Sequence, residues 1–415
     1  MRKGLLFFSL VLSLLLSGCS DPYAELSEEY NLETDYPQTF YTPAFGANIA
    51  PAENGYYFQN GSFIYYMDYG ALEPVVLCSK PECRHENESN PEEVWKCAGF
   101  VSPETGCEFL QYYEGNLYVI GRMNQFAKTV EETSDTVLFR INAANGTKEV
   151  VRRVNCSNAV FTTLHRGYLY QYYADTNGVF HLVQMSITSE DPGKELFTSE
   201  AAPFSKAYFF GNGIFISSWY VNDDGYIGNT VMYDLKSGTV KEILSDVPQD
   251  QYYAVSGCID GKVLLQLSTI TGETEESGKV FLYDAETDTC EQIGVLKGEE
   301  NLPAFIQTDG SNLMAVYENA MADDTSGLNR RIEILNDDFT TEKAVSIASL
   351  PSFYGIASGD ENCLFIWYSY GKDGETYIAL DVVDKVNNMT VKTVSDKAFA
   401  VIYPPVSIPA SALGK

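Results

Sequence analysis

Positively charged residues are scarce in this chain of 415 residues. It contains 27 Lys and Arg against 57 Asp and Glu, so its formal net charge is −30 at pH 7. A surface of this sign repels the phosphates of nucleic acids and the headgroups of anionic lipids. The composition therefore argues against a nucleic-acid partner. It favours solubility, or association with cations and basic partners.

The motifs of familiar enzyme classes are also lacking. The sequence has no G-x-S-x-G elbow, no H-E-x-x-H, no P-loop and no G-x-G-x-x-G turn. Of its three histidines, His165 precedes a turn and His181 starts a β-run, positions where structural or exposed roles are the ordinary ones. The 57 acids allow a catalytic pair of the glycosidase kind, but no motif locates one. The sequence leans away from an enzyme without deciding the point.

Long stretches with helical periodicity are absent after the N-terminal segment, and short β-runs dominate instead. The clearest unit predicts four antiparallel strands, at Tyr252–Cys258, Lys262–Ser268, Lys279–Asp284 and Thr289–Gly294. The pair Asp260-Gly261 joins the first two as a tight hairpin, because both residues tolerate positive φ. Four such strands in about 45 residues make one propeller blade.

This unit recurs along the chain. Seven glycines preceded by a turn residue open β-rich runs at intervals of 46 to 54 residues: Gly61, Gly115, Gly167, Gly213, Gly261, Gly310 and Gly359. A period near 50 is typical of a radial array, since one blade cannot bury both of its faces alone. The sequence predicts an all-β fold, a β-propeller of four-stranded antiparallel blades, with seven blades preferred and six or eight as alternatives. We expect ring closure to pair Tyr56–Phe58 with Phe399–Tyr403, which would remove exposed sheet edges.

The only long apolar run lies at the N-terminus. Arg2 and Lys3 precede an apolar stretch that ends at Leu16, followed by Ser17-Gly18-Cys19. This arrangement predicts a secretory signal, too short for a spanning helix. The Ser-Gly-Cys run resembles the lipobox of bacterial lipoproteins, which implies diacylglyceryl transfer to the Cys19 thiol and cleavage before it. An ordinary secretory signal with an incidental cysteine is the alternative.

The expected organisation follows from these features. Residues 1–18 are a lipoprotein signal peptide, 19–45 an acidic tether, 46–405 the propeller and 406–415 a C-terminal tail. An insertion at about 77–107 interrupts the propeller. A lipid on Cys19 would place the protein at the cell membrane, facing the outside of the cell.

The insertion contains an unusual group of cysteines and a histidine. Cys78, Cys83, His85 and Cys97 match the ligand types and number of a tetrahedral zinc site, although C-x4-C-x-H-x11-C is not one of the strong spacings. In an oxidising compartment the same cysteines could instead form disulfides that staple a loop with little core of its own. We place disulfides first, zinc second and free thiols third. Cys107 could join such a disulfide.

The other cysteines lie in or beside predicted strands. Cys156, Cys258, Cys290 and Cys363 are expected to be buried small hydrophobes. Cys258 and Cys290 belong to one predicted blade and could form a disulfide. Nothing in the sequence decides between these alternatives.

The stretch Val75–Cys97 reads VVLCSKPECRHENESNPEEVWKC. It resembles a motif, L-C-x-K-P-x-C-x-H followed by a further Cys, in uncharacterised β-propeller lipoproteins of gut Firmicutes. Cys78, Cys83, His85 and Cys97 occupy the matching positions. The resemblance implies a lipid-anchored propeller along nearly the full chain, and it implies no particular chemistry.

The ligand is the least determined feature. Asp175–Gly178 and Asn222–Gly225 offer oxygen ligands at a spacing that suits Ca²⁺, but turn chemistry explains both without a metal. We expect a non-catalytic module that binds a protein, peptide or glycan through one rim or the funnel. The alternative is a propeller-type glycan hydrolase or lyase that uses carboxylates in the central funnel. A cluster of Asp, Glu, Tyr and Arg at one mouth of the channel would favour the enzyme.

Overall fold

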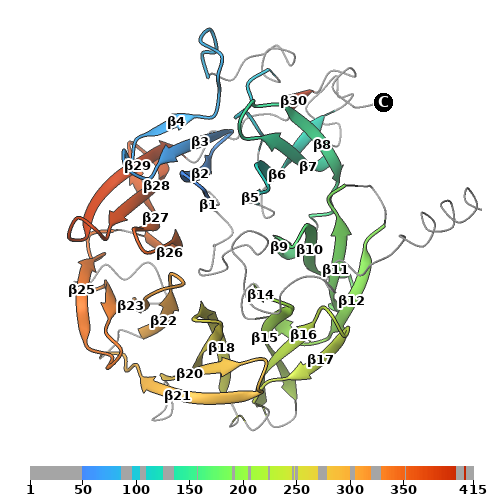
Figure 1. Cartoon of the computed structure of the whole chain (residues 1–415), viewed down its shortest axis with the longest axis vertical. Coiled ribbons are helices and arrows are strands. Elements are labelled where there is room, and N and C mark those ends of the chain that lie inside the picture. Colours follow the sequence, from blue (N-terminus) through green and yellow to red (C-terminus); the bar gives the residue numbers. More distant parts are fainter. Residues whose placement is uncertain are drawn as a thin grey trace, which may run out of the picture.

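The computed structural model shows seven antiparallel sheets arranged as blades around a central axis (Figure 1). The structure describes residues 49–85, 96–102, 109–124, 135–156, 158–188, 192–203, 207–222, 225–244, 247, 251–269, 278–299, 304–318, 329–350, 352–398 and 406–407. Within these ranges there is no helix, and hence none that could cross a membrane. The prediction of a seven-bladed β-propeller is confirmed.

The first four blades are built from consecutive strands, apart from a short C-terminal strand that joins the second. Their bounds are β1 (Ile49–Ala52), β2 (Gly55–Asn60), β3 (Phe63–Asp68) and β4 (Pro74–Val76); β5 (Leu110–Tyr113), β6 (Asn116–Asn124), β7 (Asp135–Asn142) and β8 (Lys148–Arg153); β9 (Ala159–His165), β10 (Tyr168–Ala174), β11 (Phe180–Ser186) and β12 (Lys194–Ser199); β13 (Ala202–Pro203), β14 (Tyr208–Phe210), β15 (Gly213–Asn222), β16 (Gly225–Asp234) and β17 (Thr239–Glu242). In the fourth blade, β13 and β14 both pair with β15, so the innermost strand is split in two.

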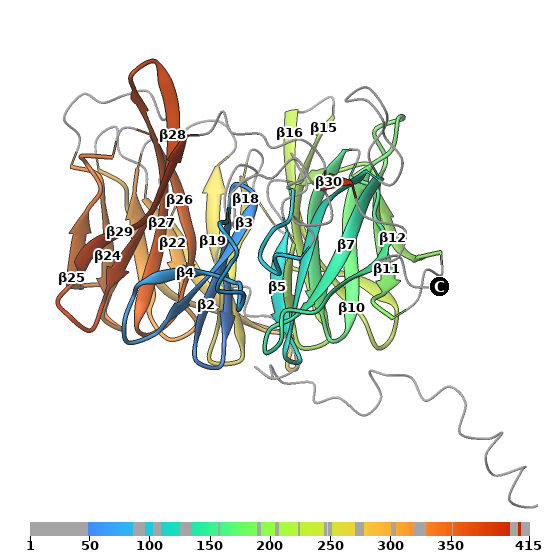
Figure 2. The same ribbon diagram turned by 90° about the horizontal axis from the view of Figure 1, so that it is seen from above.

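The last three blades follow the same order. Their bounds are β18 (Gln251–Ile259), β19 (Lys262–Thr269), β20 (Lys279–Asp284) and β21 (Thr289–Val295); β22 (Ala304–Thr308), β23 (Leu313–Tyr317), β24 (Arg331–Leu335) and β25 (Thr341–Ser346); β26 (Ser352–Gly359), β27 (Cys363–Lys372), β28 (Glu375–Asp384) and β29 (Thr390–Ala398). Seen from the side, the strands run between the two faces of the ring, and the β27–β28 hairpin rises beyond one face (Figure 2).

The fifth blade shows why the repeat is readable in the sequence. Its four strands lie where the sequence predicts them, within a residue at each end. Asp260 and Gly261 have φ values of 50° and 74°, so the turn has the two positive φ angles of a tight hairpin. The same combination occurs at Glu114-Gly115 and Arg166-Gly167 in the second and third blades. Short hairpins of this kind fix the register of the innermost strands.

Ring closure differs from the predicted strand pairing. The segment Tyr56–Phe58 lies in β2, which is hydrogen-bonded to β1 on one side and β3 on the other, so it has no free edge for a C-terminal partner. The run at 399–403 lies outside the described residues. The C-terminal strand β30 (Val406–Ser407), expected to belong to a tail, pairs in parallel with β6 of the second blade.

Side-chain packing joins the first and last blades instead. Alternate residues of β2 point to opposite sides of the sheet, so Tyr56 and Phe58 pack against Phe365 and Trp367 of the seventh blade while Tyr57 packs toward the second. The Tyr56 hydroxyl also donates a hydrogen bond to Asp360 of the seventh blade. Both faces of the first blade are apolar, so it packs against the seventh blade on one side and the second on the other. This packing joins the first and last blades without a strand of the last blade entering the first.

Candidate metal centre and channel mouth

The Cys/His group lies in the excursion that connects β4 to β5. Leu77 donates its backbone N–H to the Ile64 carbonyl, which places Cys78 directly beyond the edge of β3. Farther along, Phe100 forms a bridge with Phe63, and Ile64 donates to the Gly99 carbonyl at 2.7 Å. Both ends of the excursion are therefore tied to β3, and the segments that carry Cys78 and Cys97 lie side by side.

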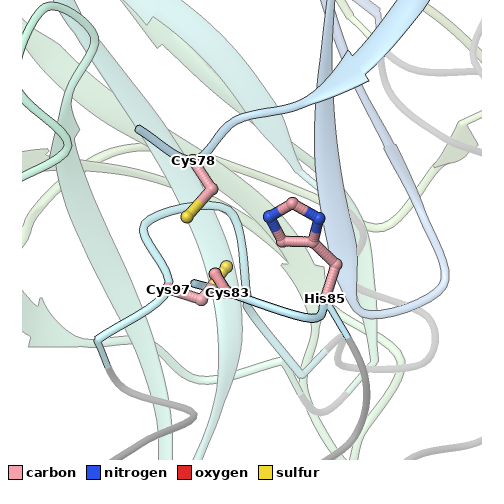
Figure 3. Close-up of side chains that lie close together, drawn as sticks. All are labelled: Cys78, Cys83, His85 and Cys97. Atoms are coloured by element: carbon pink, nitrogen blue, oxygen red, sulfur yellow. The ribbon is translucent and has the colours of Figure 1, made fainter. Parts of the chain in front are cut away.

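The four predicted side chains converge on one point. The sulfurs of Cys78, Cys83 and Cys97 and a ring nitrogen of His85 all lie within 4.8 Å of one another (Figure 3). In a tetrahedral zinc site such atoms are about 3.5–3.8 Å apart, given Zn–S and Zn–N bonds of about 2.3 and 2.0 Å. The three thiols are free, so no disulfide joins them. The group needs only a small contraction to hold a metal ion.

The His85 imidazole has one nitrogen whose hydrogen-bonding capacity is unsatisfied. Its Nε2 is buried and has no hydrogen-bond partner among the described residues, and its ring lies edge-on to Phe63 at 6.4 Å. Its backbone has a φ of 54°, which is uncommon for a residue other than glycine. A buried polar atom without a partner is destabilising, and coordination of a metal by the imidazole would remove that cost.

The electrostatics of the group favour a bound cation. Burial, together with the neighbouring Cys78 and Cys83, raises the pKa of the Cys97 thiol to about 12. The Cys97 thiol therefore keeps its proton at neutral pH in the absence of a cation, and metal binding must displace that proton. Lys148 turns its ammonium inward beside Cys97, and burial lowers its pKa to about 7.

The remaining cysteines behave differently from one another. Cys258 and Cys290 pack in the same core cluster of the fifth blade, but both are free thiols, so the disulfide considered for them is not formed. Cys363 is a buried free thiol, as expected. Cys156, expected to be a buried hydrophobe, is disulfide-bonded. Cys107, considered for a disulfide, lies outside the described residues.

The calcium candidate at 175–178 is an ordinary turn. The Asp175 carboxylate accepts hydrogen bonds from the backbone N–H groups of Asn177 and Val179, both at 2.8 Å, and these bonds lower its pKa. The second candidate, 222–225, includes residues outside the described ranges. His165 and His181 are also structural: His165 is bonded to the Gly211 carbonyl at 2.8 Å, and His181 to Glu195 at 2.7 Å.

A cavity of about 900 Å³ opens at one mouth of the central channel. Its walls come from the first, fourth, fifth, sixth and seventh blades, mainly from the turns between the two innermost strands, so it lies on the ring axis. Seven acidic residues and a single lysine, Lys262, contribute to its lining: Glu53, Asp260, Asp284, Glu286, Asp309, Asp360 and Glu361. The Asp309 carboxylate itself is buried in an ion pair with Lys385. Tyr69 supplies exposed aromatic surface, and none of the lining residues is an arginine.

Three of these carboxylates also hold the turns in shape. Asp284 accepts from the N–H groups of Glu286 and Thr287, and Asp309 and Asp360 accept from the amides of their own turns. Sequence reasoning named some of these residues as turn or strand residues but assigned none of them to a binding site. The signal was nevertheless present, because several lining residues belong to the same repeated turns that reveal the period of the propeller.

Known proteins resemble this chain in fold only. No family model and no curated protein sequence matches it. Puromycin hydrolase superposes with a TM-score of 0.50 at 10% identity, over 89% of this chain and 58% of that one. An oligogalacturonate lyase from Vibrio parahaemolyticus gives 0.47 at 12% identity, over 85% and 92% of the two chains. A dihydro-haem d1 dehydrogenase gives 0.39 at 13% identity, over 85% and 66%.

This chain thus spans a little over half the length of puromycin hydrolase. At such identities the likeness shows the propeller architecture and nothing of the chemistry.

Proposed function

We propose that this chain is a lipid-anchored, extracytoplasmic propeller that binds a basic peptide or a basic segment of a protein at the acidic channel mouth. The observation that carries the proposal is the cavity of about 900 Å³ whose lining includes one lysine and six acidic residues besides Asp309, which is paired with Lys385. A recess lined by one sign of charge focuses the electrostatic field and raises the local concentration of oppositely charged ligands. The chain's net charge of −30 acts in the same direction.

The mouth can be tested without disturbing the turns. Glu53, Asp260, Glu286 and Glu361 line the cavity, and they are distinct from the three carboxylates that hold turns. We would change these four to Gln or Asn in the domain from residue 21 onward and measure its affinity for Lys- and Arg-rich peptides. Removing four charges from an interface should weaken binding by at least about tenfold and flatten its salt dependence.

A matched control removes the same charge elsewhere. Glu242, Glu291, Glu342 and Glu375 are exposed, and three of them lie on the outermost strands β17, β21 and β25. Their change to Gln should alter peptide affinity by less than about threefold, because screening weakens distant charges. Equal losses in the two variants would mean that only net charge matters. Binding of a neutral glycan without any binding of basic peptides would refute the peptide ligand and identify the mouth as a glycan-binding site.

The same carboxylates keep one enzymatic alternative open. A glycan hydrolase or lyase needs two carboxyl groups around a scissile bond, and the mouth gathers several. The arginine that would strengthen this interpretation does not line the cavity. Release of new reducing ends from a glycan panel by the wild-type domain, and loss of that release in the four-residue mouth variant, would establish the enzyme.

The lipid anchor rests on the lipobox-like sequence. The run Leu16-Ser17-Gly18-Cys19, and the resemblance of Val75–Cys97 to propeller lipoproteins, support it. Replacement of Cys19 by Ser should release the protein from membranes into the medium. Unchanged retention in the membrane fraction would contradict the anchor.

The Cys78/Cys83/His85/Cys97 group is proposed as a structural zinc site. Bound zinc would cross-link an excursion that has little core of its own, and all four ligands would be protein side chains, as structural sites require. Protein purified without oxidation should carry about one zinc per chain, and chelation should expose three thiols to titration. Cys97→Ser should lose the metal, whereas Cys290→Ser, a free thiol in the fifth blade, should retain it. Metal-free protein with disulfides among these cysteines would refute the site.

A further inference from the structure

Lys148 stands beside the proposed metal centre without being one of its ligands. It is the first residue of β8 in the second blade, whereas the four ligands precede that blade. Its ammonium donates hydrogen bonds to the carbonyl oxygens of Cys97 at 3.0 Å and Phe100 at 2.7 Å. Part of the side chain remains accessible to solvent, but its charged end is directed toward the backbone that carries the last ligand.

The charge of a loaded site explains why a cation belongs here. Zinc with three thiolates and a neutral imidazole carries a net charge of −1. Cys97 is 3% exposed and lies in a small core cluster with Phe63 and Phe100, so this negative charge would be largely desolvated. A partly buried anion is costly unless an opposite charge lies nearby.

Lys80 is the other lysine close to the site, and it differs in one respect. Both side chains are half-buried, but the hydrogen bond that Lys80 donates to the Lys96 carbonyl at 2.7 Å is exposed to solvent, whereas both bonds of Lys148 are partly buried. Water therefore screens the charge of Lys80 more strongly. The two lysines thus make similar hydrogen bonds to the backbone around Cys97, one from the inner side and one from the solvent side. Only Lys148 adds a link to a different blade.

We infer that Lys148 is the counter-cation of the metal centre and the residue that couples metal binding to the second blade. The inference rests on the proposed zinc site. In this role Lys148 does not bind the metal: it offsets the charge of the loaded site and fixes the Cys97–Phe100 backbone that presents one of the thiolates. Partners of this kind, outside the ligand set, commonly change metal affinity by about 10–100-fold.

Three variants separate charge from hydrogen bonding. Lys148→Met keeps the length of the side chain and removes its charge, Lys148→Gln keeps a donor without the charge, and Lys80→Met is the matched control at the solvent side. Zinc affinity is measured by competition with a chelator on the whole domain. The ligand set is checked through the absorption spectrum of the cobalt-substituted protein. The urea stability of the metal-free protein is measured in parallel.

Lys148→Met and Lys148→Gln should each weaken zinc binding by about 10–100-fold, with a four-coordinate cobalt spectrum and a metal-free stability close to wild type. Lys80→Met should change the affinity by less than about threefold. If Lys148→Met does not fold, the measurement on Lys148→Gln tests the role of the charge by itself. Wild-type affinity in Lys148→Gln would overturn the role of the charge, as would equal losses of affinity in Lys80→Met. A wild-type protein that binds no zinc would refute the metal site itself.

Discussion

The contact between Lys385 and Asp309 makes a sharp test of how the sixth and seventh blades are joined. Lys385 follows β28, and Asp309 lies in the turn between β22 and β23. The two form an ion pair whose side chains are 3% and 0% exposed. Asp309 also accepts hydrogen bonds from the backbone N–H groups of Ser311 at 2.9 Å and Asn312 at 2.7 Å. The pair therefore connects the blades beside the channel mouth.

Replacing Lys385 by Met leaves the Asp309 carboxylate buried without its cation. Breaking a buried ion pair by removing one partner typically costs about 3–5 kcal/mol. The turn amides still satisfy part of the carboxylate, so we expect a loss of about 3 kcal/mol, near the lower limit of that range. Asp309→Asn should also be destabilising, because it leaves the ammonium buried and unpaired.

The assay is urea unfolding of the two single variants and of Lys385→Met combined with Asp309→Asn. Because the two groups are in contact, the double variant should lose at least about 1 kcal/mol less than the sum of the single losses. The control is Lys392→Met, which removes an exposed ion pair with Glu73 between the seventh and first blades and should cost less than about 1 kcal/mol. Additive losses in the cycle, or a loss for Lys385→Met no greater than that of the control, would refute the reasoning.

Three further variants probe other contacts. Burial raises the pKa of Glu318 from 4.5 to about 7, so the folded protein holds this proton to higher pH than the unfolded chain. Wild-type stability should therefore fall by up to about 3 kcal/mol as pH rises from about 4.5 to 7, and unfolding of Glu318→Gln at pH 5 and 8 should lack this component. Tyr56→Phe removes the hydrogen bond to Asp360 that joins the first and seventh blades, and calorimetry should show a loss of about 1–3 kcal/mol. Gly228→Ala would place a Cβ 2.2 Å from that of Tyr252 and would force β16 and β18 apart. Urea unfolding should show a loss of stability of about 1–3 kcal/mol.

Local signals made the blades predictable. The turn at Asp260-Gly261 needs only two adjacent residues that accept positive φ, and its recurrence at a period near 50 is visible without any contact information. The consecutive aromatic residues Tyr56, Tyr57 and Phe58 of β2 likewise suit a strand that is buried on both faces. Fold class and blade positions depend on neighbours within a few dozen residues, so the sequence was sufficient for them.

Contacts between distant residues were not predictable in the same way. The pairing expected between Tyr56–Phe58 and the C-terminal run was wrong because the edges of β2 are both used within its own blade. Lys385 is 76 residues from Asp309 in the sequence, and Lys148 is 51 residues from Cys97. No periodic or spacing rule relates such residues. Only the closed ring brings them together.

The candidate metal centre depends on both local and distant contacts. The sequence alone determined which side chains could act, since three thiols and one imidazole within twenty residues are the ligand types that zinc prefers. It could not separate a zinc site from a disulfide, because that choice depends on whether the sulfurs pair or converge. The anchoring of both ends of the excursion to β3 places all four candidate ligand atoms within 4.8 Å of one another, an arrangement that suits a metal ion. The residue types determine which reactions and ligands are chemically possible. The folded backbone determines which of these side chains come close enough to act together.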